Sequence, residues 1–145
     1  MTGWKESSSL SYALQGLIDL ALHQRIGPVT VKSIAKRRGI PVRYLEQIFN
    51  RLRRKGIVAA ERGPRGGYRL RKPPAKIRVS DVFRSLENGR ARRPQKGSSD
   101  PAAQLWRQVE SAVQATLHAA TLQALIEQAG ESVPSDVKHT YTFHI

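Results

Sequence analysis

The chain has 145 residues and no cysteine, and its 25 Lys and Arg against 11 Asp and Glu give a formal net charge of +14. Without cysteine, the chain cannot form disulfides, thiolate metal sites or cysteine nucleophiles. No run of about 18 apolar residues predicts a membrane span, and the N-terminal segment MTGWKESSSL has no apolar signal core, so we expect a cytoplasmic protein. So large a positive charge favours a polyanionic partner.

The positive charge is concentrated in one half of the chain. Residues 1–72 contain sixteen Lys and Arg and four acidic residues, a net charge of +12, whereas residues 73–145 contain nine and seven, a net charge of +2. This asymmetry is typical of a nucleic-acid-binding region. The alternative is a basic surface that only meets solvent, but charges scattered for solubility would not gather in one half.

Helical signals dominate the first forty residues. Apolar side chains recur every three or four residues between positions 10 and 22, after a serine (Ser8 or Ser9) that can cap a helix. Thr30 can cap a second, shorter helix, and Gly39 stands where a left-handed C-terminal stop is expected. The pattern predicts two helices joined by a short loop.

A third helix follows at once. Pro41 can open this helix because its missing N–H group is not needed there, and Gly56 ends it. The spacing predicts four buried side chains, Leu45, Ile48, Phe49 and Leu52.

A hairpin, a short helix and a loop come next. Residues 57–62 and 68–72 alternate as strands do, and the Gly- and Pro-containing segment between them predicts a tight turn. Ser80-Asp81 can cap a short helix that stops at Asn88-Gly89. Residues 90–102 are polar and without period, which indicates a loop.

A long helix is predicted over residues 103–129, which contain no Gly or Pro. It would be about 40 Å long, with one apolar stripe that a chain of this size cannot cover. We therefore expect two copies to cover each other, the alternative being a helix folded back on its own domain. The predicted dimer interface consists of Leu105, Trp106, Val109, Val113, Leu117 and Ala120.

These elements predict a mainly α fold with a small β-hairpin wing, a winged helix-turn-helix joined to a long C-terminal dimerisation helix. The predicted organisation is a DNA-binding domain at 1–89, a linker at 90–102, the dimerisation helix at 103–129 and a tail at 130–145. In this geometry the third helix enters the major groove with its N-terminal residues first.

The outward residues of the third helix suit base reading. Arg43 can pair with guanine and Gln47 with adenine. Glu46 can accept from a cytosine amino group or pair with a neighbouring arginine. Arg51 and Arg54 are expected at phosphates, with a solvated helix end as the alternative.

The wing presents arginines at its turn. Arg62 and Arg65 suit the negative potential of a narrow minor groove, and a purely structural hairpin is the alternative. The predicted DNA-binding residues are Arg43, Tyr44, Glu46, Gln47, Arg51, Arg54, Arg62 and Arg65.

The segment RYLEQIFNRLRRKG followed by RGPRGGY resembles the IscR/NsrR/CymR (Rrf-type) family of bacterial winged-helix transcription regulators. The resemblance extends over residues 8–128, through SYALQGLIDLAL near the start and LWRQVESAVQATLHAATLQALI near the end. It implies a homodimeric regulator, a repressor, on a dyad-symmetric operator. It also implies that Tyr44, Glu46, Gln47 and Arg62 match positions used to read DNA.

The chain departs from the cluster-binding members of that family. Those members carry three cysteines between the short helix and the long one, often with a nearby histidine. Here residues 89–104 have no cysteine, and Ala103 stands where the histidine would lie. We expect no iron–sulfur cluster and no other cofactor. The basic residues of the loop suggest a regulatory partner protein, a small anionic effector or DNA phosphate, of which we favour the first two; a loop that only meets solvent is the alternative.

No catalytic or nucleotide-binding motif is present, so an enzyme is not expected. The remaining alternative is a non-specific basic nucleic-acid-binding or architectural protein. The mixed chemistry of Tyr44, Glu46 and Gln47 favours sequence reading, because a non-specific binder needs only cations.

Overall fold

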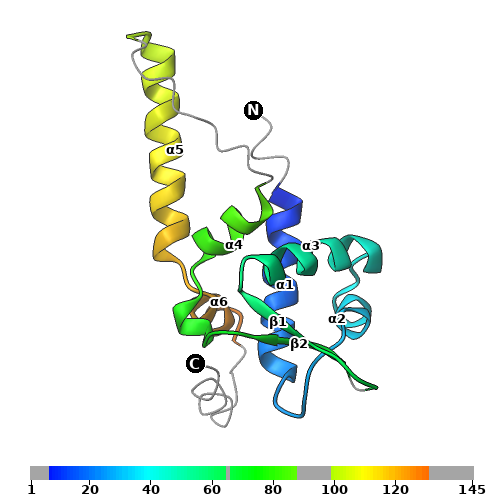
Figure 1. The fold of residues 1–145 in the computed structure, drawn as a ribbon. Helices are drawn as coiled ribbons and strands as arrows, with labels where there is room; N and C mark the ends of the chain where they lie inside the picture. The colour runs from blue at the N-terminus through cyan, green and yellow to red at the C-terminus, as the bar shows by residue number, and fades with distance from the viewer. Residues whose placement is uncertain (1–6, 65, 88–98, 131–145) are drawn as a thin grey trace.

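The computed structural model describes residues 7–64, 66–87 and 99–130. These residues form a helical head that carries a two-stranded antiparallel hairpin, and one long helix that projects from the head (Figure 1). None of the described helices is long and apolar enough to cross a membrane. The elements are α1 (Ser7–His23), α2 (Val31–Arg38), α3 (Val42–Arg54), β1 (Val58–Glu61), β2 (Gly67–Leu70), the 3-10 helix η1 (Pro74–Lys76), α4 (Val79–Leu86), α5 (Pro101–Ala119) and α6 (Leu122–Gln128).

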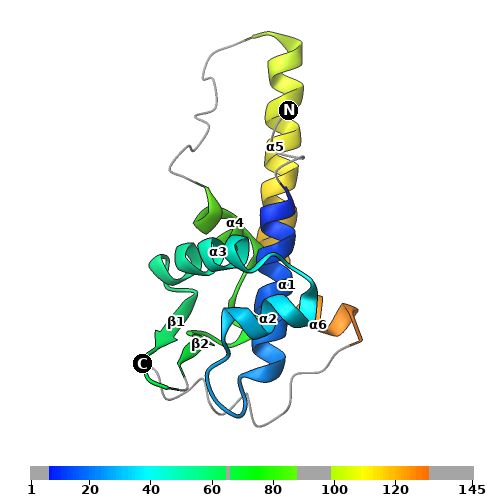
Figure 2. The same ribbon diagram turned by 90° about the vertical axis from the view of Figure 1, so that its right-hand side faces the viewer.

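Helix α1 forms the centre of the head, with α2, α3 and α4 around it, and the hairpin packs against both α1 and α3 (Figures 1 and 2). The predicted inner stripe of α3 is confirmed, since all four of its side chains are buried. At the contact between α1 and α3, a Cβ added to Gly16 would lie 2.8 Å from Phe49 Cε1. The two helices therefore approach closely at this point. The fully buried larger apolar side chains are Leu17, Leu20, Ile34, Leu45, Phe49, Leu52, Val58, Val82, Leu122 and Ile126.

The helix-turn-helix pair has the predicted ends. The Ser33 N–H group donates to Thr30 Oγ1 at 3.1 Å, which satisfies one of the free donors at the start of α2. Gly39 ends α2 in the left-handed conformation, with φ 66°. Pro41 lies at the cap position, one residue before α3, rather than inside the helix. The short turn between the two helices is fixed by these local features.

The start of α4 differs from the prediction. Ser80-Asp81 does not cap the helix, because α4 already begins at Val79, and the side chain of its cap residue, Arg78, makes no capping bond. The Val79 N–H group donates instead to the carbonyl of Ala120 at 2.9 Å, so a distant backbone group satisfies this helix end. Ser80 is buried in the first turn. The predicted stop at Asn88-Gly89 and most of the predicted loop lie outside the described residues.

The prediction of one helix over 103–129 is wrong beyond residue 119. Ala120 is extended, and the Leu122 N–H group donates to the carbonyl of Ile77 at 2.9 Å. The Ala124 N–H group then donates to Thr121 Oγ1 at 3.1 Å, which caps a new helix, α6. Leu122 and Ile126 are fully buried in the core of the head. Burial of these two side chains and the new backbone bonds favour the break over a continuous helix.

Candidate nucleic-acid interface

The hairpin is fixed against the head along one strand. Val58 pairs with Leu70 and Glu61 with Gly67 in the register of β1 and β2. The outer edge of β2 is bonded to Val29, whose N–H and C=O groups pair with those of Tyr68 at 3.0 and 2.8 Å. A Cβ on Gly67 would lie 2.6 Å from the Val29 backbone carbonyl, so only glycine permits this approach.

The aromatic side chains beside α3 fix its orientation. Phe49 meets Tyr68 of the wing edge to face, with ring centroids 5.2 Å apart. Tyr44 meets Tyr12 of α1 in the same way at 5.5 Å, and its hydroxyl bonds to that of Ser9. Tyr44 is half-buried and thus joins α3 to α1, although the sequence places it among the DNA-reading residues.

One face of α3 is open to solvent. Arg43, Glu46, Gln47 and Arg54 are exposed, and their three- and four-residue spacing places them on the face opposite the buried stripe. Arg51 is half-buried and its Nη1 donates to the carbonyl of Leu86 at 3.3 Å. Arg51 therefore links α3 to α4. The structure thus exposes four of the six predicted DNA-binding residues of this helix together on one face.

The described part of the wing presents one predicted arginine. Arg62 follows β1 directly and is exposed, while Arg65 lies outside the described residues. The neighbouring Glu61 carboxylate accepts from Arg69 Nε at 2.6 Å. This ion pair neutralises the acidic group next to Arg62, which favours an anionic partner for Arg62.

A buried carboxylate that the sequence analysis missed connects the first two helices. The side chain of Asp19 in α1 is 1% exposed. Its oxygens accept from Arg37 Nη2 at 2.6 Å and from Arg38 Nε at 3.2 Å. Two of the basic residues at the end of α2 thus hold α2 on α1. A single aspartate within the apolar run of residues 17–22 is the signal that could have revealed it.

The wing has a second unpredicted attachment at the end of α1. The Gln24 side chain is buried, and its Oε1 accepts from the Leu70 N–H group at 2.9 Å. The carbonyl of Gln24 accepts from Arg69 Nη1 at 3.2 Å. These bonds join the end of α1 to β2.

The long helix α5 has an uncovered apolar face. No residue of α5 is buried, and the side chains of Leu105 and Trp106 are 57% and 46% exposed. Val109, Val113 and Leu117 are half-buried along the same face. Ala120, the last predicted interface residue, lies in the extended break after the helix. The helix projects away from the head in both views (Figures 1 and 2).

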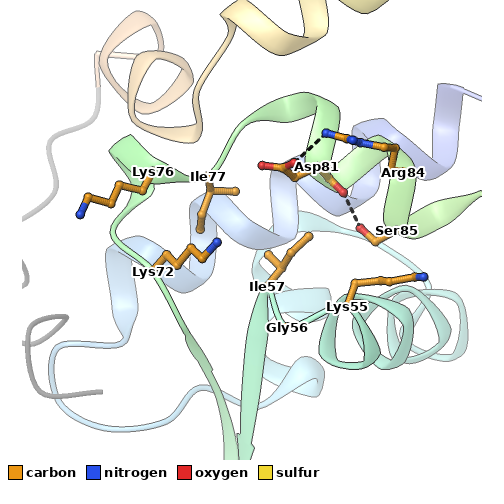
Figure 3. Close-up of a pocket in the computed structure, with 9 residues that line it drawn as sticks. All are labelled: Lys55, Gly56, Ile57, Lys72, Lys76, Ile77, Asp81, Arg84 and Ser85. Carbon is orange, nitrogen blue, oxygen red and sulfur yellow. Dashed lines mark hydrogen bonds and ion pairs between the residues drawn. The ribbon is translucent and has the colours of Figure 1, made fainter. Parts of the chain in front are cut away.

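A pocket of about 240 Å³ lies where the end of α3 meets the wing and α4. Its lining includes Lys55, Lys72 and Lys76, and its carboxylate, Asp81, pairs with Arg84 at 3.0 Å. Lys72 extends across the pocket, whereas the ammonium groups of Lys55 and Lys76 point outward on opposite sides (Figure 3). An anion site would require these cations to converge on one point, and they do not.

Comparison with known proteins agrees with this geometry. Residues 6–128 match the Rrf2 family, described as iron-dependent transcriptional regulators. The chain belongs to the Rrf2 family. It is 36% identical over 138 residues to the HTH-type transcriptional regulator IscR of Serratia proteamaculans, a match that covers 90% of this chain and 84% of the relative.

Two solved structures are similar over most of their length. IscR of T. potens is 36% identical with a TM-score of 0.73, and the match covers 85% of this chain and 86% of that one. CymR, the global cysteine regulator of B. subtilis, is 34% identical with a TM-score of 0.72, with 84% and 95% covered. The predicted winged-helix fold is confirmed, and the protein is a DNA-binding transcription regulator and not an enzyme.

The family description raises the question of iron. The sequence contains no cysteine, and cysteine thiolates are the ligands that hold iron–sulfur clusters, with histidine replacing only some of them. In the described ranges, no group of three or more His, Cys, Asp and Glu side chains is placed to hold a metal ion. The donor groups of this chain therefore do not fit an iron–sulfur cluster.

Proposed function

We propose that the protein is a homodimeric, sequence-specific repressor that reads a dyad-symmetric operator in the bacterial cytoplasm. The observation that carries the proposal is the exposed face of α3. Arg43, Glu46 and Gln47 stand together at the N-terminal end of this helix, and its other face is buried in the head. A rigid helix with mixed hydrogen-bonding groups is what base reading in the major groove requires.

Each exposed residue has a distinct proposed role. Arg43 donates to guanine, Gln47 pairs with adenine, and Glu46 accepts from the amino group of cytosine. Arg54, at the other end of α3, faces phosphates. Tyr44 and Arg51 position the helix through their bonds to α1 and α4, and either can add a phosphate contact from its exposed edge.

The wing supplies the second contact. Arg62 and Arg65 enter a narrow minor groove, where the negative potential favours guanidinium groups. The alternative, a non-specific basic architectural protein, would need only cations on this surface. The exposed Glu46 on this face favours the specific regulator, because a surface that only binds phosphates gains nothing from a carboxylate, whereas a carboxylate can accept from a cytosine amino group.

The dimer is proposed to form through α5. Its apolar face is open at Leu105 and Trp106 and half-buried from Val109 to Leu117, and a twofold interface would bury it against the same face of a second copy. Two heads on one dyad would then meet two operator half-sites.

Because the donor groups do not fit a cluster, we propose that the signal reaches the repressor through a partner protein or a small anion.

Recovery and sequencing of the genomic DNA bound to the protein would supply the operator. In mobility shifts with excess random competitor, we expect that site to remain bound by a dimer. Replacement of Gln47 by Ala should cost about 1–3 kcal/mol on the best site and relax preference at one base pair. An unchanged ranking of sites would show that α3 does not read the sequence.

A reporter gene placed behind the operator tests repression. Deletion of the regulator should raise the expression of the reporter.

A further inference from the structure

The outer edge of strand β2 is closed by two different groups. The backbone of Val29 bonds to Tyr68, as a neighbouring strand would. At the next outward N–H group, that of Leu70, the acceptor is the side-chain oxygen of Gln24 at 2.9 Å. Gln24 is 3% exposed and belongs to the turn that follows α1. One buried amide therefore continues the edge of the sheet and binds the wing to α1.

From Gln24 the connection runs on to the residue beside the wing arginine. The carbonyl of Gln24 accepts from Arg69 Nη1 at 3.2 Å, and Arg69 Nε donates to Glu61 Oε1 at 2.6 Å. The Arg69 side chain is only 22% exposed. The Gln24–Arg69–Glu61 link thus joins α1, β2 and β1, and it ends one residue before Arg62.

We propose that Gln24 and Arg69 are positioning residues, which set the wing at the orientation where Arg62 reaches DNA. Arg69 is a wing cation, but in this assignment it neutralises Glu61 and makes no contact with DNA phosphate. The inference rests on the proposed minor-groove contact of Arg62. In this assignment the buried, uncharged amide of Gln24, which lies away from the DNA-binding surface, controls the contact of Arg62.

The salt dependence of operator binding tests the proposal. Each protein–phosphate contact adds about 0.9 to the slope of log K against log salt. Replacement of Arg62 by Ala should weaken binding about tenfold and reduce the slope by about 1. Gln24→Leu, which removes no charge, should do the same because the wing no longer places Arg62. An unchanged slope in Gln24→Leu would overturn the proposal.

The double variant shows whether Gln24 affects operator binding through Arg62 or independently of it. In the Gln24→Leu protein, the further change Arg62→Ala should cost little, since its contact is already lost. Full additivity of the two losses would contradict the proposal. The control is Gln15→Leu in helix α1, where the Gln15 amide donates to Ser11 Oγ at 3.1 Å; this change should alter neither affinity nor slope.

A second variant covers the case in which Gln24→Leu does not fold, as judged by circular dichroism. Arg69→Met combined with Glu61→Gln breaks the link and keeps the net charge unchanged. It should reduce the slope by about 1, and addition of Arg62→Ala should reduce it no further. A combined reduction of about 2 would identify Arg69 as a phosphate contact and overturn its assignment.

The Arg62 contact and the positioning role of Gln24 would be contradicted by different results. If Arg62→Ala alone leaves affinity and slope unchanged, the proposed wing contact is wrong and the positioning role falls with it. If Arg62→Ala acts as expected but the effects of Gln24→Leu are additive with it, the proposed function stands and only the positioning role is wrong.

Discussion

The head and the helix α5 differ in how far they bury their apolar side chains. The head buries its apolar stripes against its own elements, and even α6, at the far end of the described chain, returns to its core through Leu122 and Ile126. Helix α5 has 19 residues and buries none of them, and Trp106 remains 46% exposed. The head therefore buries its apolar side chains within one copy of the chain, whereas the apolar face of α5 requires a second surface to cover it.

A charge on the open face of α5 should have the largest effect, and it tests directly whether α5 differs from the head. Trp106→Glu should dissociate the proposed dimer and lower operator affinity by a hundredfold or more, about 3 kcal/mol, because two half-sites are no longer held together. Sedimentation equilibrium and mobility shifts measure the two effects. The head should retain its melting temperature.

Ser111→Glu provides the matched control for that change. Ser111 is exposed on the same helix, and its spacing from Trp106 places it on the opposite face. It should remain dimeric at micromolar concentration. A dimer that survives Trp106→Glu and dissociates with Ser111→Glu would place the interface on the other face of α5.

Within the head, the buried Asp19 should give the next largest effect. Asp19→Asn leaves the guanidinium groups of Arg37 and Arg38 without their shared carboxylate. The loss should be about 2–3 kcal/mol in the free energy of unfolding, below the value for a fully buried pair because both arginines reach solvent. Urea unfolding measures it.

The exposed pair Asp81–Arg84 is the comparison for Asp19. Both of its side chains are largely exposed, 44% and 63%, so Asp81→Asn should cost less than about 0.5 kcal/mol. Equal losses for the two aspartates would mean that burial does not distinguish these ion pairs, and that Asp19 does not hold α2 on α1.

The docking of the wing should depend on one glycine. Gly67→Ala places a methyl group 2.6 Å from the Val29 backbone, and neither backbone can move without breaking the bonds to Tyr68. We expect a loss of about 2 kcal/mol in stability, together with weaker operator binding. Gly39→Asn, at a left-handed position with open space around it, should be nearly neutral because Asn tolerates that conformation.

The parts of the head that were predicted correctly depend on neighbours in sequence. The cap at Thr30, the left-handed Gly39 and the stripe of α3 are decided within one or two turns of helix. Asp19 and Gln24 escaped prediction because their partners lie 18 and 46 residues away, and no local pattern records such pairs. The reading face of α3 could be named as the outer side of an amphipathic helix, but the roles of Tyr44 and Arg51 depend on contacts with α1 and α4.

The break after α5 shows the same limit most clearly. Neither Ala120 nor Thr121 interrupts a helix by itself, and the segment contains no Gly or Pro. The break depends on the backbone of Ile77 and Val79, which pairs with residues 120–122. Thr121 was the one local sign, as a β-branched residue with an oxygen that can cap a helix.

Thr121 lies at the junction of the two regions, and its replacement should cost less than the changes at Asp19 and Gly67. Thr121→Ala removes the acceptor for the Ala124 N–H group but keeps the backbone bonds and the burial of Leu122. The expected loss is about 1 kcal/mol, with dimerisation unchanged, because α6 belongs to the head and not to α5. Thr116→Ala is the control, since its hydroxyl bonds within α5 to the carbonyl of Ala112. If Thr121→Ala weakened the dimer and left the unfolding of the head unchanged, α6 would function as part of the dimerisation helix, as its sequence pattern alone predicts.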